Sequence, residues 1–144
     1  MLRVLKAFFP ALLLTYLLAS LLATHSAMHS LRELGVAVPL AVQLQASWHD
    51  LLGMASSYLL LILVAFVIAL PIAAGLFRLL GGMRPLLFLL AGFVAMLAMH
   101  LLLSSVLNVT PVAAARSLPG LLGQCLAGAL GALFYCQLSR RPAG

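Results

Sequence analysis

The hydrophobic pattern divides the chain into four long apolar runs separated by short, more polar stretches. Each run approaches or exceeds the roughly 20 residues that a helix needs to cross the hydrocarbon core of a bilayer. The pattern therefore predicts an all-α integral membrane protein, in which a single domain over residues 1–144 forms a four-helix transmembrane bundle. The predicted spans lie at about residues 6–25, 51–77, 85–107 and 117–138.

The stretch between the first two predicted spans carries two overlapping periodicities. Every even position in residues 36–48 is apolar, which is typical of a strand. Leu40, Leu44 and Trp48 also fall on one face of a helix. Because an isolated strand near lipid leaves its backbone polar groups unpaired, the helix is the better interpretation. We expect an amphipathic helix that begins near Pro39 and lies at the interface in the first outer loop, with Trp48 as an interface anchor.

We expect this loop helix to be separated from the helices before and after it. We expect Gly35 to separate it from a shorter helix over residues 26–34. At its other end, the second span is expected to begin at Leu51, with Asp50 as the residue that caps it.

The amino-terminal run has a second interpretation, as a cleavable signal peptide whose basic region holds Arg3 and Lys6. The apolar core of a signal peptide usually has about 7–15 residues, and this run is longer. A retained first span is therefore predicted.

Composition agrees with a membrane location. The chain is 65% hydrophobic and only 7% charged, whereas soluble domains carry about 25% charged residues. Its apolar surface must face lipid, so the bilayer itself is the first predicted partner.

The basic residues predict the orientation of the spans. They gather mainly on one side of the predicted topology, and short loops rich in Lys and Arg stay in the cytoplasm. This places the protein in the cell (inner) membrane with both termini cytoplasmic. It also explains the net charge of +6 without a nucleic-acid partner. The cytoplasmic group is Arg3, Lys6, Arg78, Arg84, Arg140 and Arg141, and the outer group is Arg32 and Arg116.

Polar side chains recur at one depth in the predicted spans. At a rise of about 1.5 Å per residue, His100, Gln124, Tyr58 and Ser20 all fall in the outer third of a core about 30 Å thick. Together they form a candidate polar pocket that opens toward the outer face, with His100 as its ionisable member. In the alternative, which we favour, each polar group pairs with a neighbouring helix, a contact worth about 0.6 kcal/mol on average.

The last predicted span is rich in small residues. Gly123 with Ala127, and Gly128 with Ala132, are pairs four residues apart that let two helices approach closely. We expect this surface to pack against another helix, either in the same chain or in a second copy. The helix-packing candidates are Gly120, Gly123, Ala127, Gly128 and Gly131.

No cofactor or metal site is predicted. His25 and His29 are four residues apart, which suits metal ligation on a helix, but histidines beside a headgroup layer are usually solvated. Arg116 is interpreted as a second interface anchor that extends toward the membrane surface. With only two acidic residues in the chain, an enzyme is not favoured.

Three functions are consistent with the sequence. The leading one is a structural or accessory membrane protein that packs with itself or with a partner subunit. The second is a component of a lipid or small-molecule transporter that uses the candidate polar pocket. The third is a haem- or quinone-linked electron-transfer subunit, in which His100 contacts the redox group.

Overall fold

The computed structural model describes residues 2–53, 55–106, 108 and 113–139. These described residues form five α-helices and one 3-10 turn, and no strand. The helices are α1 (Leu2–Glu33), α2 (Leu40–Gly53), α3 (Ala55–Leu80), α4 (Arg84–Val106) and α5 (Leu118–Leu138), and the 3-10 turn is η1 (Ala113–Arg116).

Four of these helices, α1, α3, α4 and α5, are long and apolar enough to cross a membrane. The prediction of an all-helical bundle with four candidate spans is therefore confirmed. The observed helices differ from the predicted spans mainly at their ends. The largest differences are in the first two spans, because α1 extends to Glu33 and α3 begins only at Ala55.

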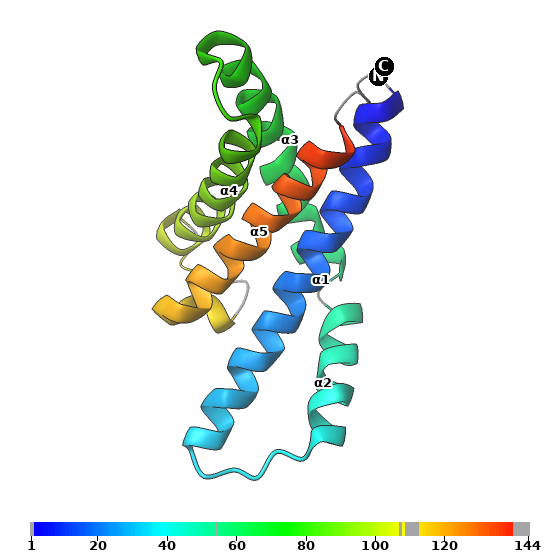
Figure 1. Cartoon of the computed structure of the whole chain (residues 1–144). Coiled ribbons are helices and arrows are strands. Elements are labelled where there is room, and N and C mark those ends of the chain that lie inside the picture. The colour runs from blue at the N-terminus through cyan, green and yellow to red at the C-terminus, as the bar shows by residue number, and fades with distance from the viewer. Residues whose placement is uncertain (1, 54, 107, 109–112, 140–144) are drawn as a thin grey trace.

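Helix α5 lies between α1 and α4, and α3 passes behind α5 and packs against both α4 and α1 (Figure 1). In the most apolar 18-residue stretch of α5, half of the residues are buried inside the chain, whereas 22% are buried in the corresponding stretch of α3. The bundle has two ends. The start of α1, the α3–α4 connection and the end of α5 lie at what we call the terminal end (Figure 1). The α1–α2 connection lies at the opposite end, the hairpin end.

Close approach of backbones holds α5 against its neighbours. A Cβ atom added at Gly128 would lie 2.6 Å from the carbonyl oxygen of Gly92 on α4. A Cβ atom at Gly131 would collide with the side chain of Thr15 on α1. Glycine is needed at these positions because no larger residue leaves the backbones so close together.

Helix α1 is longer than predicted. It continues through Glu33, so the separate helix expected over residues 26–34 is wrong. Nothing in this segment interrupts helical hydrogen bonding, and the break comes only at Gly35, whose φ is 80°. Its amide donates to the carbonyl of Arg32, and the amide of Val36 donates to that of Leu31, which is the Schellman pattern of a glycine-terminated helix.

Helix α2 begins close to the predicted position but ends later than expected. It packs antiparallel along the last part of α1 and does not lie across the end of the bundle (Figure 1). We call α2 together with α1 from Thr24 onward the hairpin. Because α2 includes Asp50 and Leu51 and α3 begins at Ala55, the expected start of the second span at Leu51 and its cap at Asp50 are wrong. Asp50 instead faces α1, where it accepts a hydrogen bond from Thr24.

Candidate functional site

Three of the four candidate pocket residues contact one another in the bundle interior. The Tyr58 hydroxyl of α3 donates a hydrogen bond of 2.7 Å to Gln124 Oε1 of α5. The ring of His100 of α4 lies edge-on to the Tyr58 ring, with 6.1 Å between centroids. All three side chains are buried, with exposed fractions of 4% or less.

Helix α1 joins this group through its backbone. Gln124 Nε2 donates to the carbonyl of Ala19 at 3.0 Å, so the Gln124 side chain links three helices. Ser20, the fourth candidate, is buried on α1 next to Ala19, and its carbonyl oxygen lies 3.2 Å from the Thr24 hydroxyl oxygen. We call Tyr58, His100, Gln124 and the Ala19 carbonyl the polar layer.

The polar layer lies at one depth in the bundle. Gln124 comes six residues after the start of α5, and His100 comes six residues before the end of α4. At a rise of about 1.5 Å per residue, both lie about 9 Å inside the ends of α4 and α5 that face the hairpin. Gln124 and His100 therefore lie at the same depth, in the third of α5 and of α4 that is nearest the hairpin.

His100 is the exception within this layer. Its Nδ1 lies 2.8 Å from the carbonyl oxygen of Met96, one turn earlier on α4. A carbonyl can only accept, so Nδ1 carries the proton, and the neutral ring has an acceptor lone pair at Nε2. That nitrogen is buried and has no hydrogen-bond partner among the residues that the structure describes.

A second set of polar contacts joins the hairpin to the bundle. The Tyr16 hydroxyl of α1 donates to the carbonyl of Leu51, near the end of α2. The Thr24 hydroxyl donates to Asp50 Oδ2 at 3.0 Å. Helix ends leave carbonyls without an intrahelical partner, and in lipid such groups must be satisfied by the protein. Tyr16 does this near the break between α2 and α3.

The sequence reasoning missed these hairpin contacts. The sequence predicts that the first span ends near residue 25 and that Asp50 caps the second span, so no contact between the two was expected. One signal was available, since a Thr and an Asp facing the same polar loop can pair if the first helix continues beyond the membrane.

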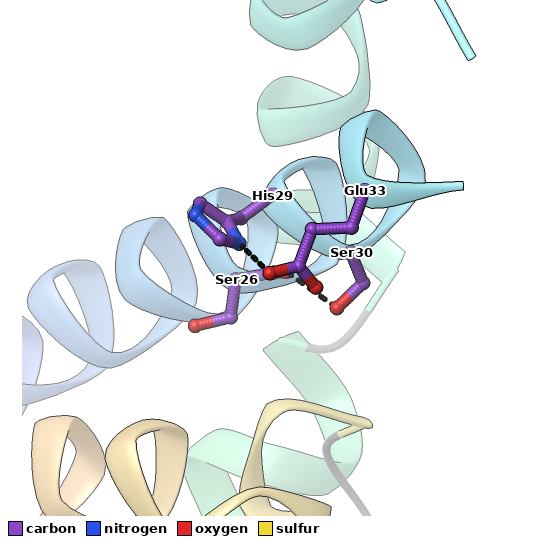
Figure 2. Close-up of polar contacts among 4 residues, drawn as sticks. All are labelled: Ser26, His29, Ser30 and Glu33. Atoms are coloured by element: carbon purple, nitrogen blue, oxygen red, sulfur yellow. Dashed lines mark hydrogen bonds and ion pairs between the residues drawn. The ribbon is translucent and has the colours of Figure 1, made fainter. Parts of the chain in front are cut away.

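The polar contacts near the end of α1 are exposed. Figure 2 shows the ion pair of His29 and Glu33, whose Nδ1 and Oε1 are 3.5 Å apart, and Ser30 donating to the Ser26 carbonyl. Both side chains of the pair are more than 60% exposed. His25 is also helical and exposed. The residues described here contain no group of three or more His, Cys, Asp or Glu side chains placed to hold a metal.

The predicted interface anchors lie at the hairpin end. Trp48 is 64% exposed on α2, and Arg116 ends the turn η1 just before α5. At the terminal end, Arg84 Nη2 donates to Ser139 Oγ at 2.9 Å. The Arg84 guanidinium also lies 5.5 Å from the centroid of the Phe88 ring, so this cation ties the start of α4 to the end of α5.

The small-residue candidates of α5 lie mainly inside the chain. Gly123 is only half-buried and faces Leu22 of α1. The sequence reasoning missed Gly92, the partner glycine on α4, although a lone glycine in an apolar helix often marks a close approach. The buried candidates are Gly120, Ala127, Gly128 and Gly131.

Comparison with other proteins adds no family to this picture. The chain matches no known family model, and no curated protein or solved structure shows significant similarity to it. The chemistry of the site must therefore be argued from the chain itself. The polar layer can fix the positions of three helices, and at His100 Nε2 it offers one hydrogen-bond acceptor.

Proposed function

We propose that the protein is a multi-pass accessory protein of the inner membrane that works by packing against a partner membrane subunit at the hairpin end. The observation that carries this proposal is an apolar stripe on α2. Its members are Leu40, Leu44, Trp48 and Leu52, with exposed fractions of 71%, 64%, 64% and 62%. They recur every four residues, so they share one side of the helix.

The position of the hairpin supports an interaction role. The bond from Gln124 places Ala19 at the level of the polar layer. Helix α1 continues from there to Glu33, which is about 21 Å at 1.5 Å per residue. The polar layer is only about 9 Å from the nearest ends of α4 and α5, so α1 projects about 12 Å beyond those ends. None of the described residues of α2 is buried, and an apolar surface left open in this way is typical of an interaction site.

The surface that follows the stripe favours a membrane-embedded partner. Beyond Leu52 the chain enters α3, which exposes Leu60, Val64 and Ile68. A helical partner within the bilayer can follow α3 and then cover the stripe. A second copy of this chain is the less favoured occupant, because Gly128 and Gly131, the small residues expected to pair two copies, already pack against α4 and α1.

The basic residues support the proposed orientation. Lys6 and Arg78 are exposed at the terminal end, where α1 starts and α3 finishes. Arg32 and Arg116 lie at the hairpin end. A terminal end in the cytoplasm follows the positive-inside bias of short loops, and the hairpin then faces the outer side.

Site-specific photo-crosslinking in native membranes tests the partner. A benzophenone amino acid replaces Leu44 or Trp48 on the stripe, and His49, at the edge of the exposed side of α2, serves as control. The expected result is one discrete product from the two stripe positions and a weaker one or none from His49. Products of dimer mass would assign the stripe to a second copy. Crosslinks to lipid alone would overturn the proposal.

Cysteine labelling tests the orientation separately. Cys125 and Cys136 are fully buried, so they should not react with a membrane-impermeant maleimide. His29→Cys, outside the stripe at a position that is 64% exposed, is expected to react in intact cells, and Lys6→Cys only after permeabilisation. The reverse pattern would overturn the cytoplasmic placement of the termini.

A further inference from the structure

His100 is the residue that the proposed partner surface leaves unused. It is 4% exposed, and its Nε2 is the buried side-chain nitrogen or oxygen without a hydrogen-bond partner in the part of the chain that the structure describes. Leaving a buried polar atom unpaired is costly, and ionisable side chains within membrane spans are functional candidates by default.

The geometry defines what Nε2 can accept. Nδ1 is held by the Met96 carbonyl at 2.8 Å, so the tautomer is fixed and Nε2 is an acceptor. Met96 lies one turn nearer the terminal end, and the two ring nitrogens point in nearly opposite directions. The Nε2 lone pair therefore points away from the Met96 carbonyl. The Tyr58 hydroxyl does not fill this role, because it donates to Gln124.

The surroundings favour an aromatic hydroxyl over a metal ion. The Tyr58 ring lies edge-on to His100, and Met96 and Met99 are buried on the same helix. Thioethers adapt to irregular shapes and contact aromatic rings favourably. A metal would need further ligands, and the described residues hold no group of three potential ones.

We propose that His100 Nε2 accepts a hydrogen bond from the hydroxyl of a membrane-soluble phenol of the quinol class, bound beside Tyr58. The site is independent of the stripe on α2. The quinol is preferred to its quinone because the quinol has hydroxyl donors, whereas the quinone oxygens can only accept.

The test uses the full chain in detergent micelles with a decyl-substituted hydroquinone as probe. Binding is measured by equilibrium dialysis for the quinol, for the matching quinone and for dodecanol. The quinol is expected to bind roughly tenfold more tightly than the quinone, because one buried hydrogen bond is made with the first and lost with the second. The quinone or dodecanol binding as tightly as the quinol would overturn the proposal.

Two variants and one spectroscopic measurement assign the contact. His100→Phe keeps a ring but removes the acceptor, and it is expected to weaken quinol binding roughly tenfold. His49→Phe, at an exposed histidine, is expected to leave binding unchanged. In the unaltered protein labelled with ¹⁵N-histidine, the quinol should shift one Nε2 resonance among the four histidines, namely the one that is absent in His100→Phe.

The NMR measurement keeps the proposal testable if His100→Phe does not fold. Unchanged histidine resonances under saturating quinol, or equal quinol affinity in the folded variant, would overturn it. A haem absorbance band in the purified protein that depends on His100 would assign the lone pair to iron and also overturn it.

Discussion

The α4–α5 pair and the α1–α2 hairpin are both antiparallel helix pairs, but they are held by different contacts. Between α4 and α5, Gly92 and Gly128 bring the two backbones into direct contact. Between α1 and α2, the contacts are hydrogen bonds of side chains, such as Thr24 to Asp50 and Arg32 to Gln43, and the apolar face of α2 stays exposed.

The difference follows from the surroundings of the two pairs. Apolar side chains gain little by leaving lipid for a neighbouring helix, so small residues that allow close packing hold helices together there. At the hairpin end, polar bonds set the position of α2 and leave its apolar stripe for another contact. The first pair therefore maintains the fold, and the second displays a surface.

The largest expected effect breaks the first pair. Gly92→Ala places a methyl group against the backbone carbonyl of Gly128, which cannot move as a side chain does. We expect a loss of about 3 kcal/mol in the free energy of unfolding, at the upper end of overpacking effects. Thermal unfolding in detergent, followed by circular dichroism, measures it.

Gly75→Ala on α3 is the matched control. No heavy atom lies within 4 Å of a Cβ added there, and alanine is the better helix former by about 1 kcal/mol. The control is expected to be neutral or slightly stabilising. Equal destabilisation by both variants would mean that backbone contact is not what holds α4 and α5 together.

A smaller effect is expected from the polar layer. Gln124→Leu removes the bonds to Tyr58 and to the Ala19 carbonyl, and it leaves a buried hydroxyl unpaired. A loss of about 1–2 kcal/mol is expected, since interhelical hydrogen bonds in membranes are individually weak. A double-mutant cycle with Tyr58→Phe measures the coupling, and no coupling would contradict a structural role for this bond.

The four candidate spans were predictable because each is an apolar run whose length and composition suit a helix that crosses a membrane. The depth of the polar side chains was also predictable, since a constant rise per residue converts sequence position into height. This is why His100 and Gln124 were expected in one layer, and in the structure both contact Tyr58.

The hairpin was less predictable because its packing depends on partners far apart in the sequence. The one local indication, a Thr and an Asp beside the same polar loop, predicts their contact only if α1 is known to continue past Thr24. The residue that packs against Gly128 could not be predicted for the same reason. Its small-residue spacing is visible in α5, but the identity of Gly92 on another helix depends on the three-dimensional arrangement.

The hairpin contacts are expected to give a local effect. Thr24→Val keeps the shape of the side chain but removes the donor to Asp50. We expect a loss of about 0.5–1 kcal/mol, typical of one partly exposed hydrogen bond, and faster amide hydrogen exchange in α2 than in α5. Ser30→Ala, whose hydroxyl bonds only within α1, serves as control. If Thr24→Val accelerates amide exchange equally in α2 and α5, the hairpin and the bundle unfold as one unit.

The smallest effect is expected at the ion pair of His29 and Glu33, at the far end of the hairpin (Figure 2). The two side chains are 64% and 69% exposed and lie on the same helix, so water and salt screen their attraction and neither residue holds α2 in place. Glu33→Gln should change the free energy of unfolding by less than about 0.5 kcal/mol. The measurement is thermal unfolding in detergent at low and high salt. A loss larger than that of Thr24→Val would mean that polar contacts on the surface of the hairpin, and not those between its two helices, determine its stability.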